Sequence, residues 1–292
     1  MPARHIALAV LASVIWGLAF VAIKIGLESF TPSQLTALRF IIACAPVFFL
    51  TRPSIDWPML VLIGMTLFTG QFLLLFFAYA NGMPAGLASV TQQTQAFFTV
   101  LLAAVFLRDI PTARQTIGMA VAFAGLAMIG LTVGSDLTAI GLGLALASAF
   151  SWAVGNVLVK RIGRVPMLPL MAWLSLIPPV PGLLVSVLYD DEWSLLGAVA
   201  DASWMSIGAA LYLGAFATTL AYAMWGTLLA RYATAKVAPF ALLAPCVGVV
   251  SSSLIFSELF GPMRYAGMAL ILAGLAVIVL PVGAKWPASR RA

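Results

Sequence analysis

The sequence contains 292 residues, of which 63% are hydrophobic and 8% are charged, and its formal net charge is +6. Soluble domains carry about a quarter charged residues, so this composition excludes a cytosolic enzyme, a disordered chain and a nucleic-acid-binding protein. The basic residues lie between long apolar blocks, as the basic loops of membrane proteins do. Cys44 and Cys246 both lie in apolar runs, which indicates neither a disulfide framework nor a metal site.

The apolar blocks predict an all-α membrane protein with ten transmembrane helices. A spanning helix needs ~20 mostly apolar residues to cross ~30 Å of hydrocarbon. Residues 57–107 carry no charge and are too long for one span, but Asn81-Gly82-Met83-Pro84 divides them. The continuous apolarity of each block argues against a β-barrel, whose strands alternate. In chain order, the helices are expected over residues 6–27, 33–51, 59–80, 84–107, 112–133, 138–160, 168–189, 204–229, 236–257 and 263–283.

Ten spans place both ends of the chain on one side of the membrane. The basic residues are divided unevenly between the two sides, because all but Lys24, Arg39 and Arg264 fall on the side of the termini. Such a bias sets the orientation of a membrane protein, so both termini are expected in the cytoplasm. A cleaved signal peptide over residues 1–25 is the alternative, but that apolar run is long and lacks a clear small-residue cleavage site.

The second half of the sequence repeats the first. Gly118-Met119-Ala120-x4-Gly125-Leu126-Ala127 recurs 149 positions later as Gly267-Met268-Ala269-x4-Gly274-Leu275-Ala276, and the same offset pairs Asp109 with Glu258. Glycines seven residues apart share a helix face, and we interpret these stripes as helix-packing surfaces.

Each half holds five predicted helices, an odd number, so the halves are expected to be inverted relative to each other. We expect one repeat over residues 1–134 and the other over residues 135–292. Inverted repeats are common in secondary transporters, which bind substrate near the membrane midplane where the repeats meet. A duplicated structural scaffold is the alternative.

Polar side chains inside the spans mark the candidate site. The predicted helix 84–107 carries the most polar segment of any span, and buried amides or aromatic rings on other helices add to the set. On one straight helix, one face would hold Ser89, Gln92, Gln93, Gln95, Ala96 and Thr99. Polar groups in hydrocarbon need partners or water, so they line a cavity or bond neighbouring helices. Tyr79 and Tyr222 lie nearer helix ends, where an interfacial belt is an equal alternative. The candidate substrate-binding residues are Trp16, Gln71, Tyr79, Ser89, Gln92, Gln95, Trp152, Asn156 and Tyr222.

Several kinds of chemistry lack the residues they need. The single histidine, His5, is at the amino-terminal edge, so no dyad, zinc site or haem ligand pair forms within the spans. No Walker loop is present, and no acid lies at the centre of a predicted span. We therefore expect neither an enzyme nor a cofactor. We expect facilitated transport, or transport that is coupled through groups at the helix ends. Arg39 lies about two turns into its predicted helix, and Glu28 is its candidate ion-pair partner.

Several strings together resemble the EamA family of the drug/metabolite transporter superfamily. They are Asn81-Gly82-Met83-Pro84-Ala85-Gly86-Leu87-Ala88-Ser89, Gln95-Ala96-Phe97-Phe98-Thr99, Ala149-Phe150-Ser151-Trp152 with Gly155-Asn156, Trp225-Gly226-Thr227-Leu228-Leu229-x-Arg231-Tyr232, Val237-Ala238-Pro239 and Trp16-Gly17 to Lys24. The resemblance covers about residues 6–283 and is strongest to bacterial exporters of O-acetylserine and cysteine, then of aromatic amino acids. It implies a bacterial inner-membrane exporter, with a cavity lined by helices 1, 3, 4, 6, 8 and 9.

The sequence and the resemblance lead to one interpretation, an alternating-access amino acid exporter with an uncharged midplane cavity. Amides would bind the amino and carboxylate groups of a zwitterion, and Trp16 and Trp152 would contact its side chain. The expected partners are a small-molecule amino acid or metabolite and the lipid bilayer, with no nucleic acid, in a monomer or homodimer. An exporter of drugs or hydrophobic cations and a non-transporting membrane scaffold are the alternatives.

Overall fold

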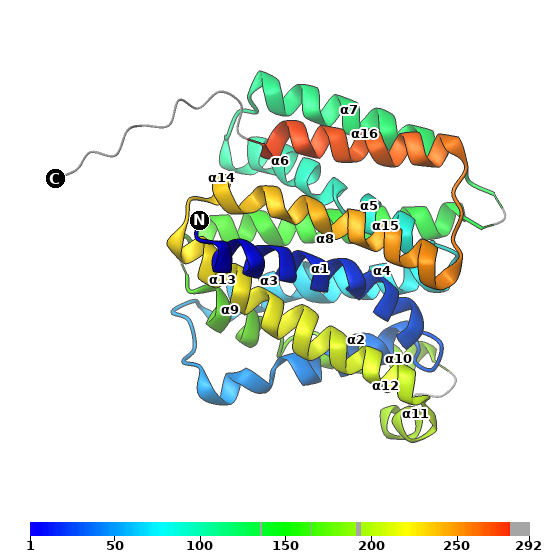
Figure 1. Ribbon diagram of the computed structural model, residues 1–292. Helices are drawn as coiled ribbons and strands as arrows, with labels where there is room; N and C mark the ends of the chain where they lie inside the picture. Colours follow the sequence, from blue (N-terminus) through cyan, green and yellow to red (C-terminus); the bar gives the residue numbers. More distant parts are fainter. Residues whose placement is uncertain (135, 164, 191–193, 281–292) are drawn as a thin grey trace.

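The chain runs back and forth through ten long helical segments that lie side by side (Figure 1). The computed structural model describes residues 1–134, 136–163, 165–190 and 194–280. Within these residues ten helical segments are long and apolar enough to cross a membrane, and no strand occurs. The predicted all-α class and the ten spans are therefore confirmed.

The first five spans are built from nine helical segments or shorter turns. They are α1 (Ala3–Gly26), α2 (Pro32–Ala43) with the 3-10 turn η1 (Ala45–Phe49), α3 (Trp57–Gly64), the π-helical η2 (Met65–Gly70), α4 (Gln71–Ala80), α5 (Ala85–Thr91), α6 (Thr94–Leu107) and α7 (Ala113–Gly130). Local sequence explains several starts: Thr31 and Thr112 each form a capping box with a glutamine three residues on, which satisfies free backbone N–H groups.

The second five spans follow the same plan. They are α8 (Ala139–Ile162), α9 (Met167–Leu174), α10 (Pro179–Tyr189), α12 (Trp204–Leu211), the π-helical η3 (Tyr212–Leu220), α13 (Ala221–Arg231), α14 (Thr234–Val237), the 3-10 turn η4 (Ala238–Leu242), α15 (Leu243–Phe256) and α16 (Pro262–Val279). The short helix α11 (Leu195–Asp201) lies across one end of the bundle (Figure 1).

The inverted repeat is visible in matching irregularities. The third span of each half contains a π-helical segment, η2 or η3, and such segments are rare and often lie at functional sites. Arg108 and Ser257, 149 positions apart, both end a helix in the left-handed backbone region, with φ of 55° and 53°. Asp109 and Glu258 follow them directly.

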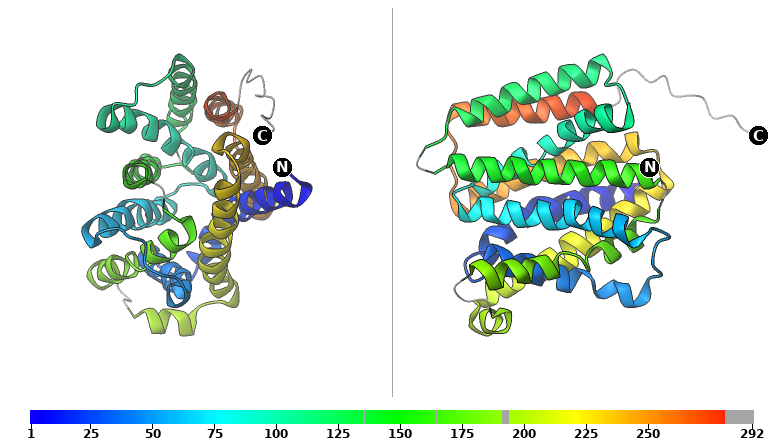
Figure 2. Two further views of the ribbon diagram at one scale, coloured as in Figure 1. Left: turned by 90° about the vertical axis from the view of Figure 1, so that its left-hand side faces the viewer. Right: turned by 180° about the vertical axis from the view of Figure 1, so that it is seen from behind.

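The repeated glycines bring α7 and α16 into close contact. A Cβ atom added to Gly125 would stand 2.5 Å from the backbone oxygen of Gly267, and one added to Gly118 would stand 2.8 Å from that of Gly274. The two helices lie side by side at one edge of the bundle (Figure 2). The glycine stripes therefore serve helix packing, in which close backbone approach maximises dispersion contacts.

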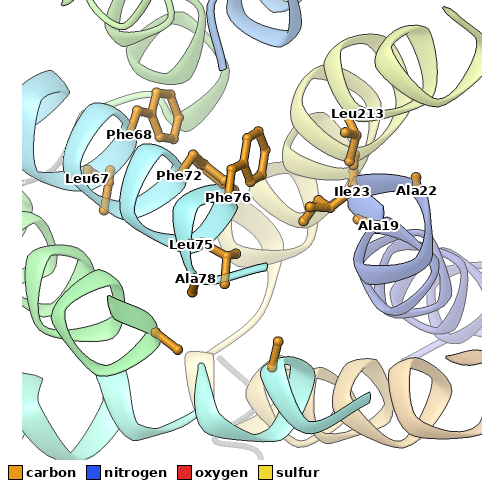
Figure 3. Close-up of a cluster of buried hydrophobic side chains, with 14 of the residues drawn as sticks. Ala19, Ala22, Ile23, Leu67, Phe68, Phe72, Leu75, Phe76, Ala78 and Leu213 are labelled. Carbon is orange, nitrogen blue, oxygen red and sulfur yellow. The ribbon is translucent and has the colours of Figure 1, made fainter. Parts of the chain in front are cut away.

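Large aromatic residues fill the space between the helices of the first half and their neighbours. Phe68, Phe72 and Phe76 follow one another along η2 and α4, and Ile23 and Leu213 lie on helices across from them (Figure 3). Phe68 and Phe76 are fully buried. This cluster forms one wall of the cavity described below, because Phe72 also lines that cavity.

A charged contact joins the loop between the halves to the last span. Arg264 on α16 donates from Nη2 to Asp136 Oδ1 at 2.8 Å and from Nε to the Thr132 hydroxyl at 2.9 Å. The hydrogen bond and the charge of Arg264 hold the pKa of Asp136 below its ordinary value. Because the folded-state pKa is depressed, the contact stabilises the fold above the ordinary carboxyl pKa and is lost as the pH falls through the folded value.

The Asp136→Asn variant should therefore unfold at a lower temperature than the wild type at neutral pH. The difference should be small, about 1 kcal/mol or less, since the carboxylate is largely exposed. Thermal unfolding of the detergent-purified proteins between pH 7 and pH 3 provides the measurement. The two melting temperatures should converge at the acid end, and a constant gap across this range would contradict the assignment.

Candidate functional site: a cavity between the halves

A cavity of about 350 Å³ lies between the two halves of the bundle. Both halves supply its walls, and the lining residues include Trp16, Phe20, Arg39, Gln71, Phe72, Gln92, Gln93, Gln95, Trp152, Asn156, Met167, Met171, Tyr222, Trp225 and Leu229. Met167 and Met171 from the seventh span and Arg39 from the second add two helices to the six that the resemblance implied.

The cavity extends toward the side of the bundle that holds the amino terminus. Met167 begins α9, while Val159 and Leu229 lie within the last turn of α8 and α13. All three helix ends are on the side of the amino terminus, at the left of Figure 1. The side of the bundle away from the amino terminus, which we name the outer side, holds a separate depression of about 460 Å³. This outer depression is lined by Lys24, Phe30 and Tyr79 among others.

Most residues that the sequence singled out meet in this cavity. They are Trp16, Gln71, Gln92, Gln95, Trp152, Asn156 and Tyr222. Tyr79 and Ser89 lie elsewhere. The Tyr79 hydroxyl donates to the Phe20 backbone oxygen at 3.1 Å beside the outer depression. Ser89 is fully buried between α5 and α15, where it donates to the Gly86 oxygen at 2.7 Å and to the Pro245 oxygen at 3.2 Å.

The glutamines of the fourth span lie where its helix is interrupted between α5 and α6. Gln92 Nε2 donates to the Ala145 backbone oxygen at 3.2 Å and to Ser148 Oγ at 3.0 Å. Because a carbonyl oxygen only accepts, this contact fixes the orientation of the amide. Gln92 Oε1 is then left buried with no hydrogen-bond partner, and so is Gln71 Oε1. Both glutamines belong to the cavity lining, and each carries an acceptor without a partner.

A second amide pair links the fourth and sixth spans. Asn156 Nδ2 donates to Gln95 Oε1 at 2.8 Å. Both side chains are partly exposed to the cavity. Cavity lining and bonding between helices are therefore not alternatives for these residues, since the same amides do both.

Aromatic rings form another part of the cavity wall. Trp16 Nε1 donates to the Ala217 oxygen of η3 at 3.0 Å, which orients the indole. Its ring centroid lies 5.4 Å from that of Tyr222 and 5.1 Å from that of Trp225, both edge to face. Such pairs are rigid and present apolar faces with few polar atoms. The cavity therefore joins a polar wall to an aromatic one.

Arg39 is a charged cavity residue that the candidate set did not include. Its side chain is only 3% exposed, Nε donates to Thr218 Oγ1 at 3.0 Å, and the guanidinium carbon lies 3.8 Å from the Phe72 ring centroid. Thr218, not Glu28, is its partner, because Glu28 is exposed outside the cavity. The expectation of an uncharged cavity was therefore wrong. A lone arginine two turns into an apolar helix was the signal available.

The outer end of the bundle is closed by a clamp centred on Glu258. Its carboxylate accepts from Lys24 Nζ at 2.9 Å and from the backbone N–H groups of Ala85 and Gly86 at 3.1 and 3.0 Å, at the start of α5. Burial alone would raise the pKa of Glu258, but the hydrogen bonds from Gly86, Lys24 and Ala85 hold it below its ordinary value. We call Glu258, Lys24 and the start of α5 the outer clamp.

Small residues let α5 and α15 approach closely behind the outer clamp. A Cβ atom added to Gly248 would stand 2.5 Å from Ser89 Cβ, and one added to Gly86 would stand 2.3 Å from Ser252 Oγ. The repeat-related pair at the other end of the bundle is Lys160 with Asp109, at 2.6 Å, and both side chains are more than half exposed. The contact at the outer clamp is thus more buried than its equivalent at the other end, toward which the cavity extends.

Known proteins match this chain over nearly its whole length. The EamA-like transporter family matches residues 3–131 and 139–280. A "probable amino-acid metabolite efflux pump" of Escherichia coli (strain K12) is 38% identical over 96% of this chain and 95% of its own, and that of Salmonella typhimurium is 41% identical over 93% of each. A "probable terminal-alkyne amino-acid exporter" of Streptantibioticus cattleyicolor is 28% identical over 92% of this chain and 91% of its own.

A solved crystal structure has the same fold. It covers 95% of this chain and 98% of its own, with a TM-score of 0.66 at 21% sequence identity. The family match and the matched relatives identify the family, and the ten spans agree with it. The chain belongs to the EamA-like transporter family and is a multi-pass exporter of the inner membrane.

Proposed function

We propose that this exporter carries amino acids and related metabolites out of the cytoplasm by alternating access. The observation that carries the proposal is the cavity between the two halves, which is lined by both amides and aromatic rings. Its volume of about 350 Å³ falls within the ~300–1,000 Å³ range of small-molecule sites. The names of the efflux relatives point to the same solutes.

The direction of transport follows from an orientation that the basic residues favour. With the termini in the cytoplasm, the open end of the cavity faces the cytoplasm and the outer clamp faces outward. An exporter loads from the cytoplasm, so this conformation is the one that accepts substrate. Release then requires the outer clamp to open and the opposite end to close, a rocking of the two halves about the cavity.

The two rival functions make different predictions. An exporter of hydrophobic cations would gain from a buried acid, yet among the described residues no acidic side chain lines the cavity and one arginine does. A membrane scaffold would move no solute at all. A flux screen of the purified protein in liposomes, over the twenty amino acids and their O-acetylated derivatives, separates these functions. Repeating the screen with a pH gradient at constant membrane potential tests the expectation of facilitated transport.

Within that screen, Trp152→Ala and Gln92→Ala should each lower the efflux of transported amino acids by about tenfold. The reason is that a lost contact to a buried polar or aromatic partner costs ~1–3 kcal/mol. Ile140→Ala is the matched control and should transport normally, because Ile140 lies on the same helix as Trp152 but is 64% exposed and outside the cavity lining. If neither cavity variant alters the efflux of any amino acid, the site is elsewhere.

A further inference from the structure

Two arginine side chains are buried in the described part of the chain, and only one of them faces a carboxylate. Arg264 donates to the Asp136 carboxylate from Nη1 and Nη2, and to the hydroxyl and backbone oxygen of Thr132 from Nε and Nη2. Arg39 donates to a neutral hydroxyl, that of Thr218, through Nε. Its Nη1 is buried and has no hydrogen-bond partner at all. Arg39 is therefore a buried cation with an unused donor at the cavity wall.

A buried charge without a counter-charge is strongly unfavourable, because desolvation is not offset by pairing. The acids of the described residues do not supply one. Glu258 binds Lys24, Asp109 binds Lys160, Asp136 binds Arg264, and Asp190 accepts from the hydroxyls of Thr31 and Ser33. Glu28, Asp56 and Asp201 are exposed. Among the described residues, then, no carboxylate pairs with Arg39, and a bound solute could supply one.

The guanidinium is held in a fixed place, as a binding group should be. Phe72 lies against its face at 3.8 Å and Thr218 holds its Nε edge. Both contacts leave the terminal nitrogens free, and these are the nitrogens that bind a carboxylate in the strong two-bond arrangement. Gln71, the neighbour of Phe72 on α4, carries one of the two unpartnered amide oxygens, and Gln92 carries the other. Donor and acceptors thus line one cavity.

We propose that Arg39 binds the carboxylate of the transported solute, and that the free Gln71 and Gln92 oxygens accept hydrogen bonds from its ammonium group. This inference rests on the proposed function and narrows it: the substrates are carboxylates, chiefly α-amino acids. Amines and amides of the same shape are rejected, since they would leave the guanidinium buried and unpaired. A site built around a charged partner discriminates strongly against analogues that lack that partner.

The test uses amino acids and their α-carboxamides, which differ only in the group that Arg39 would bind. Purified protein in liposomes is assayed with O-acetyl-L-serine, L-cysteine and L-phenylalanine, each beside its carboxamide, together with the other amino acids of the flux screen. The wild type should transport an accepted acid at least about tenfold faster than its carboxamide. This comparison needs no variant, so a folding defect cannot obscure it.

Variants then assign the preference to Arg39. Arg39→Gln should lower transport of the acid at least about tenfold and bring the ratio of acid to carboxamide near one, and Arg39→Lys should keep part of that ratio. Arg264→Gln removes the other buried guanidinium, far from the cavity lining, and should keep the wild-type ratio. A purely structural role for Arg39 would lower both rates together and leave the ratio unchanged.

The outcomes distinguish a failure of this inference from a failure of the proposed function. If the wild type moves amino acids and their carboxamides at equal rates, the inference is overturned while amino acid export stands. The same conclusion follows if Arg39→Gln folds and keeps the acid preference. If no amino acid moves at all, the proposed function fails and this inference fails with it.

Discussion

Replacing Glu258 by glutamine is expected to open the outer end of the bundle. The change keeps the shape of the side chain but removes the charge that Lys24 and the start of α5 bind. Each lost hydrogen bond to a charged group costs ~1.5–3 kcal/mol. Since ~1.4 kcal/mol corresponds to a tenfold change in an equilibrium, the population with an open outer end should rise at least about tenfold.

Chemical labelling of the cavity from outside measures that population. Ala19, which lines the cavity, is replaced by cysteine in a chain whose Cys44 and Cys246 are serine. A membrane-impermeant maleimide, added to the outside of oriented vesicles, should react much faster when Glu258→Gln is also present. Amino acid efflux should fall, because the substrate-accepting conformation is depopulated.

Asp109→Asn is the matched control, because Asp109 is the repeat equivalent of Glu258. Its carboxylate is 58% exposed and binds Lys160. An exposed ion pair contributes ~1 kcal/mol or less, so this variant should label from outside at nearly the wild-type rate. Equal labelling of the two variants would contradict the role of the outer clamp. Because the pKa of Glu258 is held below its ordinary value, its carboxylate stays charged in mildly acidic surroundings. The outer clamp therefore weakens only when the pH falls below the ordinary carboxyl range.

The largest loss of stability is expected from Gly125→Leu on α7. A Cβ atom at this position would stand 2.5 Å from the Gly267 backbone oxygen, and a backbone atom cannot turn aside as a side chain can. The helices α7 and α16 must then separate and lose dispersion contacts along their length. Overpacking costs ~1–3 kcal/mol or more, so the melting temperature in detergent should fall by ~5 °C or more.

Gly130→Leu on the same helix separates this clash from the general effect of removing a glycine. No atom lies within 4 Å of a Cβ built at Gly130. This variant should melt at or above the wild-type temperature, since leucine is the better helix former. If both leucine variants lose stability equally, the contact between α7 and α16 is not what holds this edge of the bundle.

The candidate site was partly predictable from the sequence, and two of the nine predicted residues, Ser89 and Tyr79, lie outside the cavity for physical reasons. The polar face of the fourth span was projected as if residues 84–107 formed a single straight helix. The interruption between α5 and α6 changes the direction of the residues before it, so Ser89 packs on α15 while Gln92 and Gln95 line the cavity. Tyr79 likewise belongs to the outer depression, because its place along α4 is beyond the cavity.

The sequence alone determined the spans, the breaks and the inverted repeat, because these depend on local apolarity and on residues at a constant offset. It also determined that no acid lies within the spans. Only the tertiary structure decided that Arg39 faces a cavity, that Glu258 binds Lys24 and the start of α5, and which end is closed. These features join residues from helices far apart in the chain, and the rotation of each helix about its axis is set by packing against its neighbours.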